Sequence, residues 1–414
     1  MEVLYQTCCG IDVHKQFLVA CLLVVDEAGH QHKEIRRFST MTGELLLCVD
    51  WLQKAHCKAV AMESTGVYWK PPWNVMEGLF DTVMVVNAEH LKRVPGHKTD
   101  KKDAEWIAEL LQLGLLKPSF IPSRPQRELR DLTRTRTTLI QERTRLRLIN
   151  RVHKVLEDAN LKLSSVLTDI MGQTGQHILA AIIRGEEDPR VLADMALRRA
   201  ANKRDALVLA LCGRISKHHR LLLRELLEMI GHHDQAISRL DKEIEERLRP
   251  FEKQIQQLDA IPGLSRRCIE ILFAEVGWDM SPFPDAAHLA SLVGICPGNY
   301  ESGGKRLSGR IRKGNHWVKA VLVQAAQAAA RTKNTYLSAQ YQRIAARRGG
   351  KRAAVAVGHS ILVIYYHMLK TGQPYQEKGV DYFSELDRHH AERRFTKQLE
   401  RLGYQVTLTP AQIV

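Results

Sequence analysis

Short apolar runs separated by polar turns fill the first 120 residues of the chain, and this pattern predicts an α/β domain. The runs have the length of buried strands, and we expect strands at 8–13, 17–25, 35–39, 58–62 and 82–86. Apolar residues at helical spacing predict two helices, Thr42–Ala55 and Asp103–Leu113. Pro118, Pro122 and Pro125 then interrupt the pattern, so we place the end of this domain at residue 125.

The middle of the chain, 126–258, has a seven-residue periodicity instead. Two apolar series carry it: Leu132, Leu139 and Leu146, and then Leu223, Ile230, Ile237, Ile244, Phe251 and Leu258. Such series predict long helices packed as a coiled coil, with short helices over about 164–203 at the tip of the hairpin. Pro250 lies inside the second series and predicts that this helix ends near Arg249.

The remainder is predicted to be mainly α-helical. An alanine-rich helix is expected at Trp317–Ala330, preceded by a glycine-rich basic segment at 297–314. We assign 259–380 to a C-terminal domain and 381–414 to a charged tail. The turn Ile261–Ser265 fits either a helix-hairpin-helix motif, which offers backbone N–H groups to a phosphate, or a plain connection between two helices.

Charge narrows the class of partner. The 414 residues include 61 Lys and Arg against 46 Asp and Glu, a formal net charge of +15, which favours a polyanion such as nucleic acid. None of the eight cysteines forms a C-x-x-C pair, so neither a zinc ribbon nor a redox motif is indicated. Phe17–Val25 is too short to span a bilayer and no signal peptide is visible, so we expect a cytoplasmic, nucleoid-associated protein with no membrane partner.

Four carboxylates form the candidate catalytic site. Asp12 and Glu63 each close a predicted strand, and Asp100 and Asp103 are spaced to share one face of a helix. Alone, the helix pair fits a helix cap and a solvated acid, and Asp12 fits a turn residue. Together, four oxygen donors can hold a pair of divalent cations, Mg²⁺ or Mn²⁺, as phosphoryl transfer requires.

Three segments around these carboxylates resemble the acidic motifs of the DEDD insertion-sequence transposases, the IS110 and IS1111 types related to the Piv invertases. They are Gly10–Lys15, Met62–Tyr68 and Lys98–Ala104. The resemblance covers nearly the whole chain. It implies a RuvC-like (ribonuclease-H-like) N-terminal domain, consistent with the order of predicted elements, and Asp12, Glu63, Asp100 and Asp103 as metal ligands.

The glycine-rich segment is a second candidate site, because backbone N–H groups and cations suit a phosphate. Its cations are Lys305, Arg306, Arg310, Arg312 and Lys313, near the hydroxyls of Ser302 and Ser308. Without the resemblance, a solvated basic loop against DNA explains the pattern equally well. The segment is similar to the transposase domain of the same family, and this implies that Ser302 is a covalent nucleophile on DNA. Ser308 is the alternative.

The first long helix is strongly basic, and we expect its exposed arginines to contact phosphates. The candidates are Arg130, Arg134, Arg143, Arg147 and Arg151, with few acidic residues within the helix to oppose them. The apolar seam predicts packing within the chain or a homo-oligomer, a dimer or tetramer. The family resemblance adds a structured guide RNA encoded by the element, although composition does not distinguish RNA from DNA.

The sequence therefore predicts a transposase, a site-specific DNA recombinase that cleaves and rejoins DNA. Two alternatives stay open: a RuvC-like structure-specific DNA nuclease that only hydrolyses, and a non-enzymatic coiled-coil protein that organises nucleic acid. An actin-like or sugar-kinase ATPase is disfavoured, because Val13-His14-Lys15-Gln16 follows Asp12 where a glycine-rich phosphate loop belongs.

Overall fold

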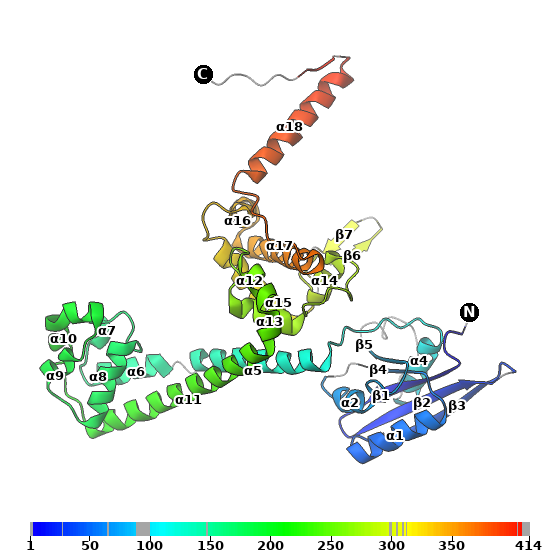
Figure 1. The fold of residues 1–414 in the computed structure, drawn as a ribbon, viewed down its shortest axis with the longest axis horizontal. Helices are drawn as coiled ribbons and strands as arrows, with labels where there is room; N and C mark the ends of the chain where they lie inside the picture. Colours follow the sequence, from blue (N-terminus) through cyan, green and yellow to red (C-terminus); the bar gives the residue numbers. More distant parts are fainter. Residues whose placement is uncertain are drawn as a thin grey trace. The chain divides into compact units, whose positions relative to one another are not determined.

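A computed structural model gives the fold (Figure 1). It describes residues 3–26, 28–63, 66–87, 100–145, 148–297, 300–303, 305–308, 310–311, 313–403 and 405–407. The chain divides into two compact units, Met1–Ile121 and Pro122–Val414, and each is described by itself. The first unit ends four residues before the boundary expected at residue 125.

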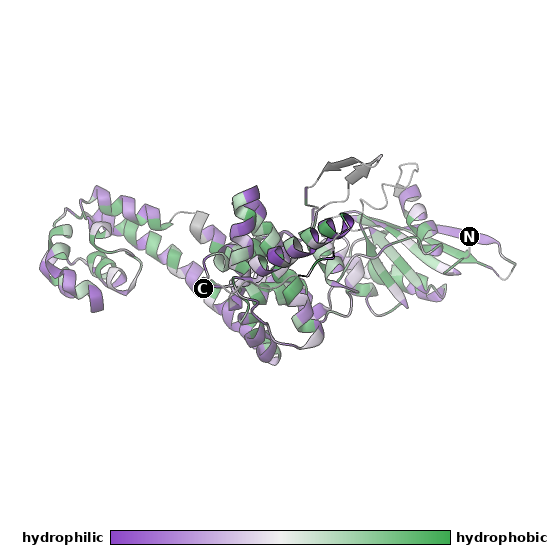
Figure 2. Ribbon diagram, turned by 90° about the horizontal axis from the view of Figure 1, so that it is seen from above, coloured by the Kyte–Doolittle hydropathy of each residue, from purple (hydrophilic) through white to green (hydrophobic). Residues whose placement is uncertain are grey.

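The first unit is built on a five-stranded mixed sheet of order β3-β2-β1-β4-β5. The strands are β1 (Thr7–Val13), β2 (Phe17–Val25), β3 (Gln31–Ser39), β4 (Ala59–Glu63) and β5 (Thr82–Val86). The first three pair antiparallel, whereas β4 is parallel to both β1 and β5. β1 and β4 are buried almost throughout, as expected for strands covered on both faces, and the sheet is largely coloured as hydrophobic in Figure 2.

Helices cover both faces of this sheet. One face packs on α1 (Thr42–Lys54) and α2 (Lys70–Met76) through a core that includes Ile11, Leu52 and Met62. The other face packs on α4 (Asp100–Gln112) through Cys8, Ala61 and Ile107 among others. The predicted ribonuclease-H-like α/β fold of this unit is confirmed, with β3 extending over Gln31–Ser39 rather than 35–39.

The second unit begins with a long helical hairpin. Its two arms are α5 (Arg124–Arg145) with α6 (Leu148–Asp158), and α11 (Lys217–Leu248), and they pack together (Figure 1). In Figure 2 these helices alternate between hydrophilic and hydrophobic positions. Leu223, Ile230, Ile237 and Ile244 are all buried, as the heptad series predicted. α11 ends at Leu248 and the short η2 (Arg249–Phe251) follows, which confirms the break predicted at Pro250.

Short helices form the tip of the hairpin around a separate apolar core. They are α7 (Leu163–Val166), α8 (Gln173–Arg184), α9 (Pro189–Asp194), η1 (Arg198–Lys203) and α10 (Arg204–Ala210). Leu179, Leu192 and Leu207 are fully or almost fully buried in this core. The tip is thus a small folded body, as its irregular pattern over about 164–203 suggested.

The rest of the second unit is a helical bundle with one β-ribbon. Its helices are α12 (Glu252–Asp259), α13 (Arg266–Glu275), α14 (Ala286–Val293), α15 (His316–Ala329), α16 (Tyr336–Arg348), α17 (Gly350–Thr371) and α18 (Tyr382–Arg401). The ribbon consists of β6 (Tyr300–Ser302) and β7 (Lys305–Ser308), within the segment expected to be a loop. Hence the mainly α fold predicted for the C-terminal region is confirmed.

Among the described residues, one helix is long and apolar enough to cross a membrane by length and composition, α17. Half of its apolar window is buried, and it packs against α14, α15 and α16. Tyr365 and Tyr366 within it donate hydrogen bonds to the backbone oxygens of Gly277 and Phe283. These contacts are those of a core helix.

Candidate active site

Asp12 and Glu63 lie side by side at the ends of two neighbouring parallel strands. β1 and β4 pair in register as far as Ile11 and Met62, so the next residue of each strand is a carboxylate. Cys8 on β1, and Ala59 and Ala61 on β4, pack on the α4 face of the sheet. Because side chains alternate between faces, Asp12 and Glu63 belong to the same face. Asp12 is only 7% exposed, which makes its charge costly unless it is compensated.

Helix α4 is held against this face at a glycine. A Cβ added to Gly10 would lie 2.3 Å from the Ala104 carbonyl oxygen and 2.3 Å from the Ala108 backbone nitrogen, so only glycine permits this approach. The Cys8 thiol donates to the Ala108 carbonyl, one turn further along α4. The helix therefore runs antiparallel to β1, and its first turn approaches the Asp12 end.

This direction brings the remaining two acidic positions towards the first two. One helical turn advances about 5.4 Å and two strand residues about 6.6 Å. Since Ala104 lies at Gly10, position 100, one turn earlier, falls near the level of Asp12. Asp100 and Asp103 continue the rows of Ala104 and Ile107, which face the sheet. For Asp100 the structure describes the backbone only, whereas the Asp103 side chain is half-buried.

His14 is a residue of this site that the sequence analysis did not select. Its Nε2 lies 3.1 Å from Oδ2 of Asp12. The ring packs against Phe17, with the ring centroids 4.6 Å apart and the planes tilted by 36°, and the His14 amide donates to the Phe17 carbonyl across the β1–β2 turn. The imidazole thus lies in direct contact with the Asp12 carboxylate. Its two-residue spacing from Asp12, just past the end of β1, is the signal that could have identified it.

The donor set fits a hard divalent cation by its chemistry, since carboxylate oxygens are the ligands that Mg²⁺ and Mn²⁺ prefer. The buried Asp12 beside Glu63 supplies the negative charge that such a cation offsets. Among side chains that the structure describes, which exclude that of Asp100, no group of three or more potential ligands is already gathered.

Ser302 lies at the tip of the β6–β7 ribbon. It pairs with Lys305 across a two-residue turn, and Gly303 in that turn has φ of +58°, a conformation that favours glycine. Tyr300 pairs with Ser308 at the other end. The side chains of Ser302, Lys305, Arg306 and Ser308 lie outside the described part, as does residue Arg312, whereas Arg310 and Lys313 are exposed.

Glu275 of α13, whose side chain is fully buried, joins this helix to α5 and to the start of α15. Arg134 donates to both carboxylate oxygens, from Nε at 2.6 Å and Nη2 at 2.8 Å. Asn315, which caps α15 just after the ribbon, donates to Oε2 at 2.7 Å. Arg130 approaches Oε2 at 3.2 Å, and burial lowers the pKa of its guanidinium.

Two of the arginines expected to bind nucleic acid form ion pairs within the protein. Arg130 and Arg134 have acidic partners from another helix, which the count of charges within their own helix did not reveal. Arg136, 1% exposed, likewise contacts Glu270 and Asp241. Phosphate contact stays a prediction for Arg151, which is exposed on α6; the side chain of Arg143 and the whole of Arg147 lie outside the described part.

The turn Ile261–Ser265 is covered by another helix. A Cβ on Gly263, whose φ is +88°, would lie 2.2 Å from the Ala325 carbonyl of α15. Ile261 is fully buried. Of the two readings of this turn, a plain connection between α12 and α13 therefore fits better than a phosphate-binding hairpin.

Two protein-family models match parts of this chain. A DEDD model described as a transposase matches residues 9–161, and one described as "Transposase IS116/IS110/IS902 family" matches residues 255–342. The first range contains all four carboxylates and the second contains Ser302.

Two relatives and one solved structure are similar to this chain. The transposase for insertion sequence element IS1111A of Coxiella burnetii is 24% identical over 381 residues, 89% of this chain and 90% of that one. A probable family 20 transposase of Pseudomonas aeruginosa is 26% identical over 318 residues, 75% of this chain and 83% of that one. The Thermus thermophilus RuvC structure matches 27% of this chain and 99% of its own at 15% identity, with a TM-score of 0.23.

Proposed function

Because the chain belongs to the DEDD transposases of IS110-type insertion elements, we propose that it cuts and rejoins DNA at the ends of its element with divalent cations held by the four carboxylates. The observation that carries this proposal is the convergence of Asp12, Glu63 and the first turn of α4 on one edge of the sheet. Bound Mg²⁺ or Mn²⁺ would stabilise the charge that develops on phosphate oxygens during strand cleavage.

The residues of the chain have separate tasks in this proposal. Asp12, Glu63, Asp100 and Asp103 provide the cation ligands, and His14 contacts the Asp12 carboxylate. Gly10 keeps the acidic turn of α4 close to the strand ends. The cations held by these carboxylates would bind a phosphate of the DNA substrate.

We further propose that Ser302 attacks a phosphate of the DNA substrate. Its Oγ loses a proton and forms a phosphoserine ester, while a phosphate–deoxyribose bond breaks and the released oxygen takes up a proton. Rejoining reverses these steps with a different strand end. Support comes from the position of Ser302 at the tip of a β-ribbon that also contains Lys305 and Arg306.

Ser302→Ala tests this step against simple hydrolysis. On a plasmid that carries the element ends, we expect the variant to lose recombinant junctions, while Ser308→Ala retains them. Junction formation by Ser302→Ala would overturn the covalent step. Nicked products without junctions from the wild-type chain would favour the alternative of a RuvC-like nuclease.

Two partners complete the proposal. A structured RNA encoded by the element is supported by the net charge of +15 and is tested by sequencing the nucleic acid that copurifies with the protein. Self-association through the hairpin is supported by Leu222 and Met229, seven residues apart on α11 and 36% and 41% exposed. Light scattering on the Leu222→Glu, Met229→Glu double variant should then show a smaller oligomer than the wild type.

A further inference from the structure

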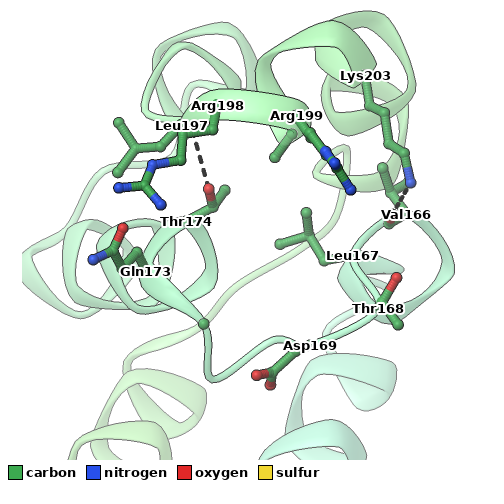
Figure 3. Close-up of a pocket in the computed structure, with 12 residues that line it drawn as sticks. Val166, Leu167, Thr168, Asp169, Gln173, Thr174, Leu197, Arg198, Arg199 and Lys203 are labelled. Atoms are coloured by element: carbon green, nitrogen blue, oxygen red, sulfur yellow. Dashed lines mark hydrogen bonds between the residues drawn. The ribbon is translucent and has the colours of Figure 1, made fainter.

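The tip of the helical hairpin contains a cavity of about 410 Å³ that neither the carboxylates nor the Ser302 ribbon uses. It is lined by the loop between α7 and α8, the first turn of α8 and the helix η1 (Figure 3). Three of its lining side chains are cationic, Arg198, Arg199 and Lys203, and one is anionic, Asp169. Its volume lies in the range of pockets that hold small organic molecules.

The walls of this cavity are braced at several points. The Leu197 amide donates to the Thr174 hydroxyl at 3.0 Å, which ties the start of η1 to α8. The Lys203 ammonium donates to the Val166 carbonyl at 3.0 Å, which ties the end of η1 to α7. A Cβ on Gly175 would lie 2.0 Å from the Ile170 carbonyl, so the loop is seated directly on α8. The cavity is therefore formed before any ligand arrives.

Two of the cations are available to a ligand. Within the described residues neither Arg198 nor Arg199 forms an ion pair or a side-chain hydrogen bond, and both are exposed. Elsewhere in the tip arginines are paired: Arg204 with Asp194, and Arg220 with Glu187. Two unpaired guanidiniums on consecutive residues at the rim of one cavity suit an anion, and their planar forks match a phosphate.

The floor of the cavity is apolar, which a phosphate alone does not need. Val166, Leu167, Leu197 and Ala200 line it, and Figure 3 shows the Leu167 side chain in the middle of the lining residues, with Arg198 and Arg199 extending from η1 on two sides. The polar groups of Gln173, Thr168 and Asp169 surround this floor. Such a lining suits a nucleobase. The flat face of the base can pack on the apolar side chains or on a guanidinium plane, and its edges can form hydrogen bonds with the polar groups.

We propose that this cavity binds one unpaired nucleotide, with its base on the apolar floor and the phosphates on either side of it at Arg198 and Arg199. A base inside a duplex is stacked on both faces and cannot enter, so the ligand is single-stranded or has an extruded base. The strand is RNA or DNA, which share this chemistry. The proposal rests on the proposed function only in taking nucleic acid as the ligand.

Photo-crosslinking with the full-length protein tests the site directly. The probes are two 12-nucleotide single strands, one RNA containing 4-thiouridine and one DNA containing 4-thiothymidine, and the crosslinked peptides are identified by mass spectrometry. We expect crosslinks within 166–174 or 197–203 for at least one probe. Crosslinks to the RNA alone identify RNA as the source, and crosslinks to the DNA alone identify DNA. Crosslinks confined to other segments would refute the proposal.

Matched variants separate a pocket from a diffuse basic surface. Arg199→Ala should lower crosslinking in these segments about tenfold, as the loss of one well-oriented arginine contact does. Arg190→Ala removes the same charge from an exposed position on α9, in the same tip, and should leave the yield unchanged. Equal loss in both variants would show general electrostatic attraction and overturn the site.

Two further controls complete the design. An abasic 12-nucleotide competitor should displace the probe less well than oligothymidylate; equal competition would show that the base does not enter the cavity and would refute the proposal. Asp12→Asn should crosslink as the wild type does, because the cavity needs no catalysis. Failure of the proposed recombination chemistry is thereby distinguishable from failure of this site.

Discussion

Replacement of Glu275 by glutamine probes the buried network that joins α13 to α5 and to the start of α15. The substitution keeps the shape of the side chain but removes the negative charge that faces Arg134 and Arg130, and it turns one acceptor oxygen into a donor. The Glu275 side chain is fully buried, while those of Arg130 and Arg134 are 19% and 35% exposed. Breaking a buried pair costs about 3–5 kcal/mol. Because the arginines keep some water contact, we expect the lower end, about 3 kcal/mol.

Hydrogen exchange followed by mass spectrometry measures this cost locally. A loss of about 3 kcal/mol corresponds to roughly a hundredfold faster exchange where exchange follows local opening. The affected amides should be those of α13 and the first turn of α15, where Asn315 loses its acceptor. Glu128→Gln is the matched control, because Glu128 pairs with Arg247 on the surface and should change exchange in α13 very little. If Glu275→Gln accelerates exchange less than about threefold, the network does not hold α13 and the start of α15 as argued.

The first unit provides two further predictions. Gly10→Ala should force α4 away from β1, destabilise the unit by about 1–3 kcal/mol in urea unfolding and abolish DNA cleavage. Gly43→Ala is the control and should not destabilise the unit, because a Cβ at Gly43 meets nothing within 4 Å. Equal stability of the two variants would contradict the close packing of α4 on β1. Burial raises the pKa of four thiols from 9.0 to about 12: Cys8, Cys21, Cys48 and Cys57. At pH 8 iodoacetamide should therefore modify the exposed Cys212 and spare these four in the folded chain. Because these pKa values are raised on folding, above pH 9 the thiols of the unfolded chain release protons that the folded chain keeps. The urea midpoint of this unit should therefore fall as pH rises from 9 towards 12. A constant midpoint would argue against the burial of these thiols.

The sequence pattern predicted the helices and strands well where an apolar repeat extended over many residues or where a whole strand was buried. The strands β1, β2, β4 and β5 are short apolar runs, and the buried positions of α11 follow its heptad series. Pro250 ends that helix because proline cannot continue its hydrogen bonds. The ribbon at Tyr300–Ser308 was expected to be a loop, since its strands are three and four residues long and carry no alternating apolar pattern.

The basic helix shows where sequence reasoning stops. Arg130 and Arg134 pair with Glu275, and Arg136 pairs with Glu270 and Asp241. These carboxylates lie more than a hundred residues away in the sequence, so no spacing within α5 could predict the pairs. On the α5 seam, Leu132 and Leu139 are only half-buried, whereas Arg136 is 1% exposed. Burial of a paired arginine depends on tertiary packing rather than on local pattern.

In the candidate site, too, some features could be predicted from the sequence, whereas others depend on tertiary packing. Two carboxylates at strand ends and two at helical spacing could be selected from sequence, because their chemistry and periodicity are local. The role of Gly10 depends on the approach of a helix from about a hundred residues away, and the contact of His14 with Asp12 depends on the turn between β1 and β2.

Asp12→Asn is the measurement that tests the central claim most directly. The change keeps the size of the side chain and removes the charge of Asp12, which is only 7% exposed. With a plasmid that carries the element ends, and with Mg²⁺ or Mn²⁺ present, strand cleavage and junction formation should both fall by a factor on the order of a thousand, as expected when a group that stabilises the transition state is lost. DNA binding and the urea midpoint should stay close to wild type. Cleavage at an undiminished rate by the folded variant would contradict the assignment of these carboxylates to catalysis.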